Sequence, residues 1–272
     1  MNFDLPVAHW VTALVDFLMD HAQPFFDLVS NVLETLTFGI EDLLRLPPAW
    51  LLVVLLTALA WWRTRWRFAA FTAAGLATIV GMHLWQETVA TLALVLSATL
   101  VSLLLGIPLG IACARSDRVQ RLVRPVLDLM QTMPAFVYLI PAAMFFGLGQ
   151  VPGLVATIIF AMPPAVRLTN LGIRQVPEEL VEAGLAFGCT RRQLLLRVQL
   201  PAARPSIMAG INQAIMLALS MVVIASMIGA GGLGDTVLRG IQRLDVGLGF
   251  EGGLGVVILA IILDRITQSF GK

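Results

Sequence analysis

The chain has 272 residues, of which 58% are hydrophobic and only 13% charged, and its formal net charge is +1. Soluble domains carry roughly a quarter charged residues, so a chain with this composition would expose too much apolar surface to water. Its near-zero net charge lacks the basic footprint of nucleic-acid binding. With a mean hydropathy of +0.87, the composition predicts an all-α, polytopic membrane protein.

The first 46 residues differ from the rest because they combine apolar and acidic residues at helical spacing. One face carries Phe25, Leu28, Val29, Val32, Leu33 and Leu36. The other face carries Asp27, Asn31 and Glu34. We therefore expect amphipathic helices, separated near Pro24, that lie on a membrane or pack against other spans.

Seven apolar segments follow, each a candidate for the roughly 20 residues that cross a bilayer as a helix. They are Pro47–Trp62, Phe68–Trp85, Thr88–Ala114, Val126–Gly149, Val151–Thr169, Ser206–Gly229 and Gly252–Ile266. The first is barely long enough. We expect Pro134 and Pro141 to break the fourth, and Pro163–Pro164 to end the fifth. The chain thus divides into amphipathic helices (1–46), two accessory spans (47–86) and a core (87–272).

Arginines orient these spans. They gather at 63–67, 115–124 and 167–204, whereas the alternate connections 83–87 and 147–153 contain neither Arg nor Lys. The positive-inside rule places the clusters in the cytoplasm, together with the C-terminus. Seven spans would put residues 1–46 outside a bacterial inner membrane, and failure of Pro47–Trp62 to span would put them inside.

The longest polar stretch of the core, Asn170–Pro205, is cytoplasmic on this topology. Pro177 suits a first helical position, and acidic residues follow it where the helix dipole favours negative charge. Gly188 should end that helix, and Thr190 followed by Gln193 predicts a capping box that starts a second one. We expect the second helix to end before Pro201.

This stretch resembles the EAA loop of ABC importer permeases, whose pattern is E-A-A, three residues, G, nine residues, then I-x-L-P. The matching residues are Glu182-Ala183-Gly184, Gly188 and Val198-Gln199-Leu200-Pro201. Gly184 replaces an alanine and Val198 an isoleucine. The resemblance implies that residues 177–201 dock on an ATPase subunit. The coupling residues it implies, together with the acidic first turn, are Glu178, Glu179, Glu182, Ala183, Gly184, Gly188, Leu200 and Pro201.

Four further segments are similar to the glycine betaine/proline betaine permease family. They are Gln131–Tyr138, Pro163–Asn170, Met227–Gly234 and Arg239–Asp245, and the similarity extends over Thr88–Lys272. It implies a type I ABC importer permease fold, two permease copies, two ATPase subunits that carry ATP and Mg, and an external binding protein. The implied cargo is glycine betaine or a related osmoprotectant such as proline betaine, choline or carnitine, with an amino acid as another possibility.

The chain itself offers no nucleotide site. A phosphate-binding loop needs Gly-Lys-Ser/Thr, and the only lysine is Lys272. We therefore predict a permease subunit that is not an enzyme and carries no metal or cofactor. Polar residues and irregular backbone within spans are candidates for the translocation path: Thr132, Pro134, Tyr138, Asn212, Gln213 and Ser220. Hydrogen bonding between helices is the alternative role for the polar ones.

A self-contained secondary transporter or channel is the alternative function. Such proteins commonly carry internal repeats and charged residues within the membrane. This sequence has no clear repeat and few acidic residues in its spans. Uptake driven by an ion gradient without an ATPase partner would favour that alternative.

Overall fold

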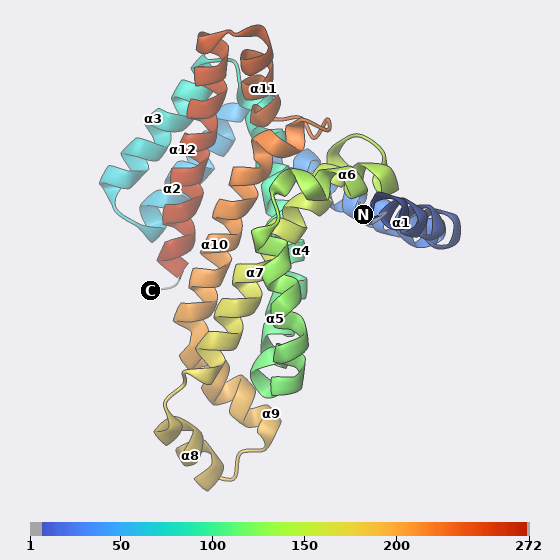
Figure 1. Ribbon diagram of the computed structural model, residues 1–272. Coiled ribbons are helices and arrows are strands. Elements are labelled where there is room, and N and C mark those ends of the chain that lie inside the picture. The colour runs from blue at the N-terminus through green and yellow to red at the C-terminus, as the bar shows by residue number, and fades with distance from the viewer. Residues whose placement is uncertain (1–6, 271–272) are drawn as a thin grey trace.

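The computed structural model describes residues 7–270; the first six residues of the amphipathic unit and the last two of the core, including Lys272, lie outside them. The described chain is helical nearly throughout, which confirms the all-α expectation (Figure 1). Its helices are α1 (Val7–Arg45), α2 (Ala49–Arg63), α3 (Trp66–Gly81), α4 (Trp85–Arg115), α5 (Asp117–Thr132), α6 (Ala135–Phe146), α7 (Gln150–Arg174), α8 (Glu178–Ala186), α9 (Arg191–Leu194), the π-helical turn η1 (Leu195–Gln199), α10 (Leu200–Ser226), α11 (Leu233–Arg243) and α12 (Val246–Phe270).

Four long helices, α4, α7, α10 and α12, carry the main core. Leu94, Leu154, Leu219 and Ile262, one from each helix, are nearly inaccessible and belong to one apolar cluster. The hairpin of α2 and α3 packs against α12, and α1 projects from the bundle on the other side, beside α6 (Figure 1).

Glycines let the core helices approach closely. Gly106 and Gly110 lie one turn apart on α4, facing α7, and a Cβ atom at Gly110 would stand 2.7 Å from the carbonyl oxygen of Val166. Gly172 plays the same part between α7 and α10, where its Cβ would lie 2.6 Å from Cβ of Ser206. Small residues at crossings are typical of membrane bundles, in which van der Waals packing supplies much of the association energy.

The described residues offer fewer candidate membrane-crossing helices than the seven predicted. Among the described residues, four helices are long and apolar enough, and counting each of two sharply bent helix pairs as one span gives up to six. The four are α4, α7, the continuous helix Arg191–Ser226, and α12. Helix α3, with 16 residues, is shorter than a typical span.

The predicted span Val126–Gly149 is two helices, not one. α5 and α6 meet at 101° across Pro134. A proline disfavours the helical conformation of the residue before it, and Met133 is extended, with ψ 137°. Tyr138 of α6 donates its hydroxyl to the carbonyl oxygen of Met130 and so fixes the bend. Pro141 lies within α6, where the expected break is absent.

Two other predicted helix breaks are also wrong. α1 runs without interruption through Pro24, and α7 continues for ten residues beyond Pro164 to Arg174. Packing overrides the local preference in both cases. Phe26 stacks on Phe145 of α6 with ring centroids 4.5 Å apart, and α7 is held between α4 and α10.

Candidate coupling surface and translocation path

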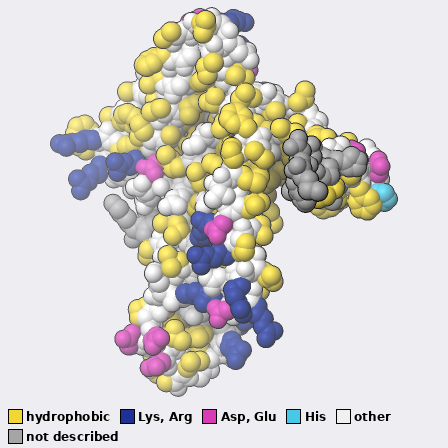
Figure 2. Space-filling view, viewed as in Figure 1, with side chains coloured by type: hydrophobic (Ala, Val, Ile, Leu, Met, Phe, Trp, Pro, Cys, Tyr) yellow, Lys and Arg dark blue, Asp and Glu magenta, His cyan; other side chains and the backbone are white. Residues whose placement is uncertain are grey.

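Helix α8 stands beyond the end of the bundle, joined to α7 through a short non-helical segment (Figure 1). Pro177 is the N-cap of α8 and not its first helical residue, so the helix begins one residue later than expected, at Glu178. Glu178 and Glu179 fill its first turn, as predicted, and they and Glu182 are exposed. The three carboxylates form no ion pair within the described part of the chain, and Figure 2 shows acidic side chains at this end.

Gly188 ends α8 as predicted. It has φ +78°, a left-handed conformation that glycine adopts without a steric penalty. The N–H of Gly188 donates to the carbonyl of Leu185 at 2.9 Å, and the N–H of Cys189 donates to that of Gly184 at 3.0 Å. This pair of bonds is a Schellman motif. It satisfies the last carbonyls of α8 and reverses the chain within two residues.

The second helix begins with the predicted capping box. Thr190 Oγ1 accepts from the N–H of Gln193 at 3.3 Å, and Gln193 Oε1 accepts from the N–H of Thr190 at 2.8 Å. The predicted end before Pro201 is wrong, because α9 passes through η1 into α10. The N–H of Leu200 donates five residues back to Leu195. We attribute the continuity to this wider turn, which relieves the clash of a proline ring with the preceding turn.

The coupling residues do not all lie on one surface. Glu182 and Ala183 are exposed, but Gly184 is buried, and a Cβ there would stand 2.7 Å from Cδ1 of Leu194. The glycine at this family alanine position therefore seats α8 on α9. Leu200 packs inward beside Ile173 and Leu195, whereas Pro201 is exposed in the first turn of α10.

Sequence reasoning missed the apolar part of this surface. Leu180, Leu185 and Phe187 are 47%, 53% and 89% exposed. They belong to helix α8 and its closing turn, residues 178–188, here called the α8 unit. Exposed apolar residues clustered beside charges mark interaction sites. The sequence does show three large apolar residues in a short polar loop, but it does not show which of their side chains are exposed.

The six path candidates divide into two groups. Thr132, Pro134, Gln213 and Ser220 are exposed, and Gln213 and Ser220 share one side of α10 with Met216. Tyr138 is buried at the α5–α6 bend, and Asn212 Nδ2 donates to Asp264 Oδ1 of α12 at 2.8 Å. Tyr138 and Asn212 therefore make the hydrogen bonds between segments of the bundle that were the alternative to a place in the translocation path.

Two arginines tie α5 to α7 near the arginine-rich end. Arg167 Nη2 lies 2.6 Å from Asp128 Oδ1, and its Nη1 donates to Gln131 Oε1. Arg174 Nη2 lies 2.6 Å from Asp117 Oδ1 and also donates to the carbonyl oxygen of Cys113. Between these links lies a pocket of about 350 Å³. From the sequence we used these arginines only to orient the spans.

A bundle of long apolar helices with a short helical unit projecting from one end is the architecture of a multi-pass membrane protein. The chain belongs to the family of binding-protein-dependent transport system inner membrane components, whose family model matches residues 106–272. It is therefore an inner-membrane protein, as predicted.

Individual relatives are similar over almost the whole chain. The glycine betaine/proline betaine transport system permease protein ProW of Escherichia coli is 51% identical over 98% of this chain and 76% of its own length. The glycine betaine/carnitine transport permease protein GbuB of Listeria monocytogenes is 52% identical, over 98% and 96%. The resemblance to betaine permeases is thereby confirmed.

The fold has a solved counterpart. An inward-facing structure of the MetNI methionine ABC transporter superposes with a TM-score of 0.62 at 19% identity, over 67% of this chain and 91% of that one. At this identity the match concerns the fold alone. It confirms the expected type I ABC importer permease fold.

Proposed function

We propose that this chain is the membrane-spanning subunit of an ATP-driven importer of glycine betaine or a closely related quaternary-ammonium osmoprotectant. The α8 unit is the observation that carries this proposal. It is a capped, glycine-terminated helix that projects from a membrane bundle and presents apolar and acidic side chains together. The cargo class is taken from the relatives, ProW and GbuB.

In this proposal α8 docks on a separate ATPase that binds ATP and Mg. Leu180, Leu185 and Phe187 supply an apolar contact, and the glutamates supply charge that favours a basic rim on the partner. Apolar cores with polar rims are the usual anatomy of protein interfaces. The arginine-rich ends of the helices, α8 and the C-terminus would then face the cytoplasm.

The translocation path would form between two copies of the permease. The exposed side of α10 carries Ala209, Gln213, Met216 and Ser220. This side carries two polar side chains that suit a zwitterion, and α10 contains no aromatic residue that could hold a quaternary ammonium by cation–π contact. An external binding protein would capture the cargo. ATP binding would close the ATPase dimer and turn the paired permeases outward, and hydrolysis would reset them.

The test is co-purification in detergent after co-expression with the ATPase subunit of the same transport system. Phe187→Ala should reduce the recovered ATPase several-fold without changing permease yield, because the side chain is 89% exposed and supports no core. Phe250→Ala is the matched control, since that phenylalanine is 69% exposed on α12. Equal recovery with both variants would contradict the docking role of α8.

Reconstitution in lipid with the binding protein tests the cargo. ATP hydrolysis that rises only with glycine betaine-loaded binding protein would support both the importer and its cargo. A complex that ignores betaine but responds to choline or carnitine would keep the importer and replace the cargo. If the folded permease forms no complex with the ATPase, the secondary-transporter alternative gains support.

A further inference from the structure

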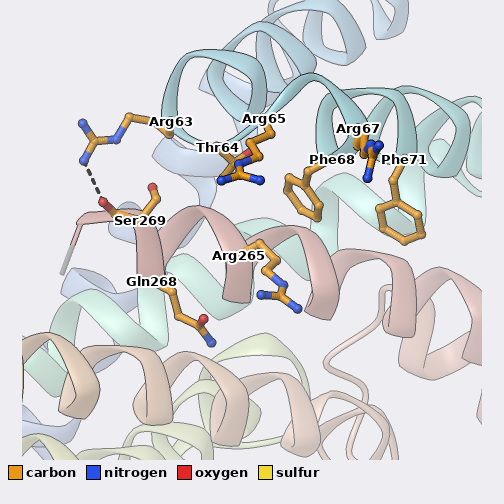
Figure 3. A pocket seen from close by; sticks show the side chains of 9 residues that line it. All are labelled: Arg63, Thr64, Arg65, Arg67, Phe68, Phe71, Arg265, Gln268 and Ser269. Atoms are coloured by element: carbon orange, nitrogen blue, oxygen red, sulfur yellow. Dashed lines mark hydrogen bonds between the residues drawn. The ribbon is translucent and has the colours of Figure 1, made fainter. Parts of the chain in front are cut away.

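A basic pocket lies far from the coupling surface, between the α2–α3 turn and the last turns of α12 (Figure 3). Its volume is about 610 Å³. It is lined by Arg63, Thr64, Arg65, Arg67, Phe68, Phe71, Arg265, Gln268 and Ser269. Four of these nine residues are arginines and none is acidic. The pocket therefore concentrates positive charge that its own walls do not neutralise.

The guanidinium groups have no carboxylate partners in the described chain: no ion pair forms at Arg63, Arg65, Arg67 or Arg265. Asp264 precedes Arg265, but its Oδ1 is engaged by Asn212 of α10 and by Gln268. An unpaired cluster of like charges is unfavourable by itself, and an anion bound among the charges removes that cost.

Arg63 gives the pocket a fixed wall. Its Nη2 donates to the carbonyl oxygen of Ser269 at 3.3 Å, and its Cζ atom lies 4.0 Å from the ring centroid of Phe270. The same side chain has a buried Nε–H with no hydrogen-bond partner. A buried donor without a partner is costly, and here it belongs to the side chain that already joins α2 to α12.

The rest of the wall is aromatic. Phe68 and Phe71 stack along α3 with ring centroids 5.9 Å apart, and both line the pocket. Trp61, Trp62 and Trp66 are 68%, 78% and 67% exposed around the same turn. Exposed tryptophans at helix ends are typical of the membrane–water interface. The pocket thus combines anion-binding groups with an apolar wall at the depth of lipid headgroups.

The start of α3 adds to the positive potential. Its N-cap, Arg65, provides no side-chain hydrogen bond, so the first N–H groups of the 16-residue helix lack a side-chain cap. The positive end of the helix dipole favours an anion there. A free phosphate could bind the arginines and the first N–H groups of α3, but it would make no contact with the apolar wall of Phe68 and Phe71.

We propose that this pocket binds an anionic phospholipid. Its headgroup phosphate would lie among Arg65, Arg67 and Arg265, and an acyl chain would run along Phe68 and Phe71. Basic pockets between transmembrane helices are suited to anionic lipid headgroups. The lipid would join the short α2–α3 hairpin to α12, where Arg63 already makes a direct contact with Ser269.

The first measurement uses the unaltered protein in nanodiscs. Trp61, Trp62 and Trp66 are half of the six tryptophans, and Trp62 and Trp66 are direct sequence neighbours of the lining residues Arg63, Arg65 and Arg67, so brominated lipid bound in the pocket should quench their fluorescence. At an equal low mole fraction in phosphatidylcholine, brominated phosphatidylglycerol should quench about twofold more than brominated phosphatidylcholine. Excess inorganic phosphate should leave this difference in place. Equal quenching by the two lipids would overturn the proposal, and loss of the difference with phosphate would assign the site to a free anion.

The second measurement compares two triple variants with the same change in charge. Arg65→Gln/Arg67→Gln/Arg265→Gln removes the proposed phosphate contacts. Arg115→Gln/Arg118→Gln/Arg121→Gln removes three exposed arginines of another cluster. Because one phosphate would lose three charge-assisted contacts at once, the pocket variant should retain at least roughly tenfold less phosphatidylglycerol in native mass spectrometry. The control should retain the wild-type amount, and equal loss in both variants would reduce the effect to general surface charge.

Discussion

The N-terminal helices α1–α3 and the core helices α4–α12 solve the same packing problem in different ways. In the core, glycines bring backbones together, as at Gly110 against Val166. In the N-terminal region, large apolar side chains stay outside, among them Phe25 of α1 at 62% and Trp62 of α2 at 78% exposure. The core is held by contact between its own helices, whereas much of the N-terminal surface is left for lipid or another chain.

The difference predicts unequal tolerance to substitution. A close contact with backbone atoms leaves no room for adjustment, because a neighbouring helix has to move as a whole. A contact with the end of one side chain can relax. Substitutions of similar chemistry should therefore be costly in the core and mild in α1–α3.

The largest effect is expected at Gly110. Gly110→Ala places Cβ 2.7 Å from both the Val166 carbonyl oxygen and Thr169 Cβ, and should destabilise the protein by about 1–3 kcal/mol. Gly75→Ala in α3 is the matched control. The three atoms nearest its Cβ all belong to the side chain of Ile258, with Cγ2 at 2.8 Å, so the cost should be smaller than at Gly110, because a side chain and not a backbone has to shift and helix propensity favours alanine. Thermal unfolding of both variants in detergent measures the difference, and equal shifts would erase the distinction between the two regions.

A smaller effect is expected at the α5–α6 bend. Tyr138→Phe removes the hydroxyl that donates to the Met130 carbonyl oxygen while keeping the ring. A lost buried hydrogen bond costs about 1 kcal/mol. We expect a lower unfolding midpoint and faster hydrogen exchange in residues 130–138. Phe136→Leu is the control, because Phe136 is 51% exposed in the same helix. Unchanged exchange in Tyr138→Phe would mean that Pro134 alone maintains the bend.

The Arg167–Asp128 ion pair should contribute still less to stability. Its side chains are 41% and 54% exposed, and pairs with this exposure are worth about 0.2–1 kcal/mol because solvent screens them. A double-mutant cycle with Arg167→Gln and Asp128→Asn measures the coupling between the two side chains. A coupling well above 1 kcal/mol would indicate that this end of the core is shielded from water in the assembled protein.

The effect expected in α1 has the opposite sign, because the substitution there should stabilise the protein. Gly39 lies inside the helix, and a Cβ atom added there would meet no other atom within 4 Å. Gly39→Ala should stabilise by up to about 1 kcal/mol through helix propensity alone. Thermal unfolding of the purified chain is again the measurement. A loss of stability would show that another helix approaches Gly39 in the assembled protein.

Sequence patterns predicted the features that depend on neighbouring residues. The turn at Gly188 and the capping box at Thr190 follow from local backbone chemistry, and the structure confirms both. Hydrophobic segments and composition likewise identified an all-α membrane protein.

The wrong predictions from sequence concern helix breaks at prolines, and the sequence also left open which helix faces are exposed. Pro24, Pro141, Pro163 and Pro201 favour breaks locally, but each lies within a helix that continues. Contacts distant in sequence, such as Phe26 with Phe145, or a wider turn such as η1 decide these cases. Pro134 alone produced the expected interruption. The sequence also does not specify which side of α10 faces outward, so the path residues could be identified only as polar groups in spans.

The two helices of the proposed coupling loop, α8 and α9, are attached to the core differently. Its first helix, α8, meets α7 through the non-helical residues 175–177, which act as a joint. Its second helix, α9, continues without a joint to Ser226, over 36 residues and about 54 Å. A displacement at Thr190 would therefore reach α10 along one continuous helix that includes the π-helical turn η1, whereas the same displacement would reach α7 only through the non-helical residues 175–177. One attachment is thus a continuous helix and the other a short non-helical segment, and the continuous helix carries Gln213 and Ser220.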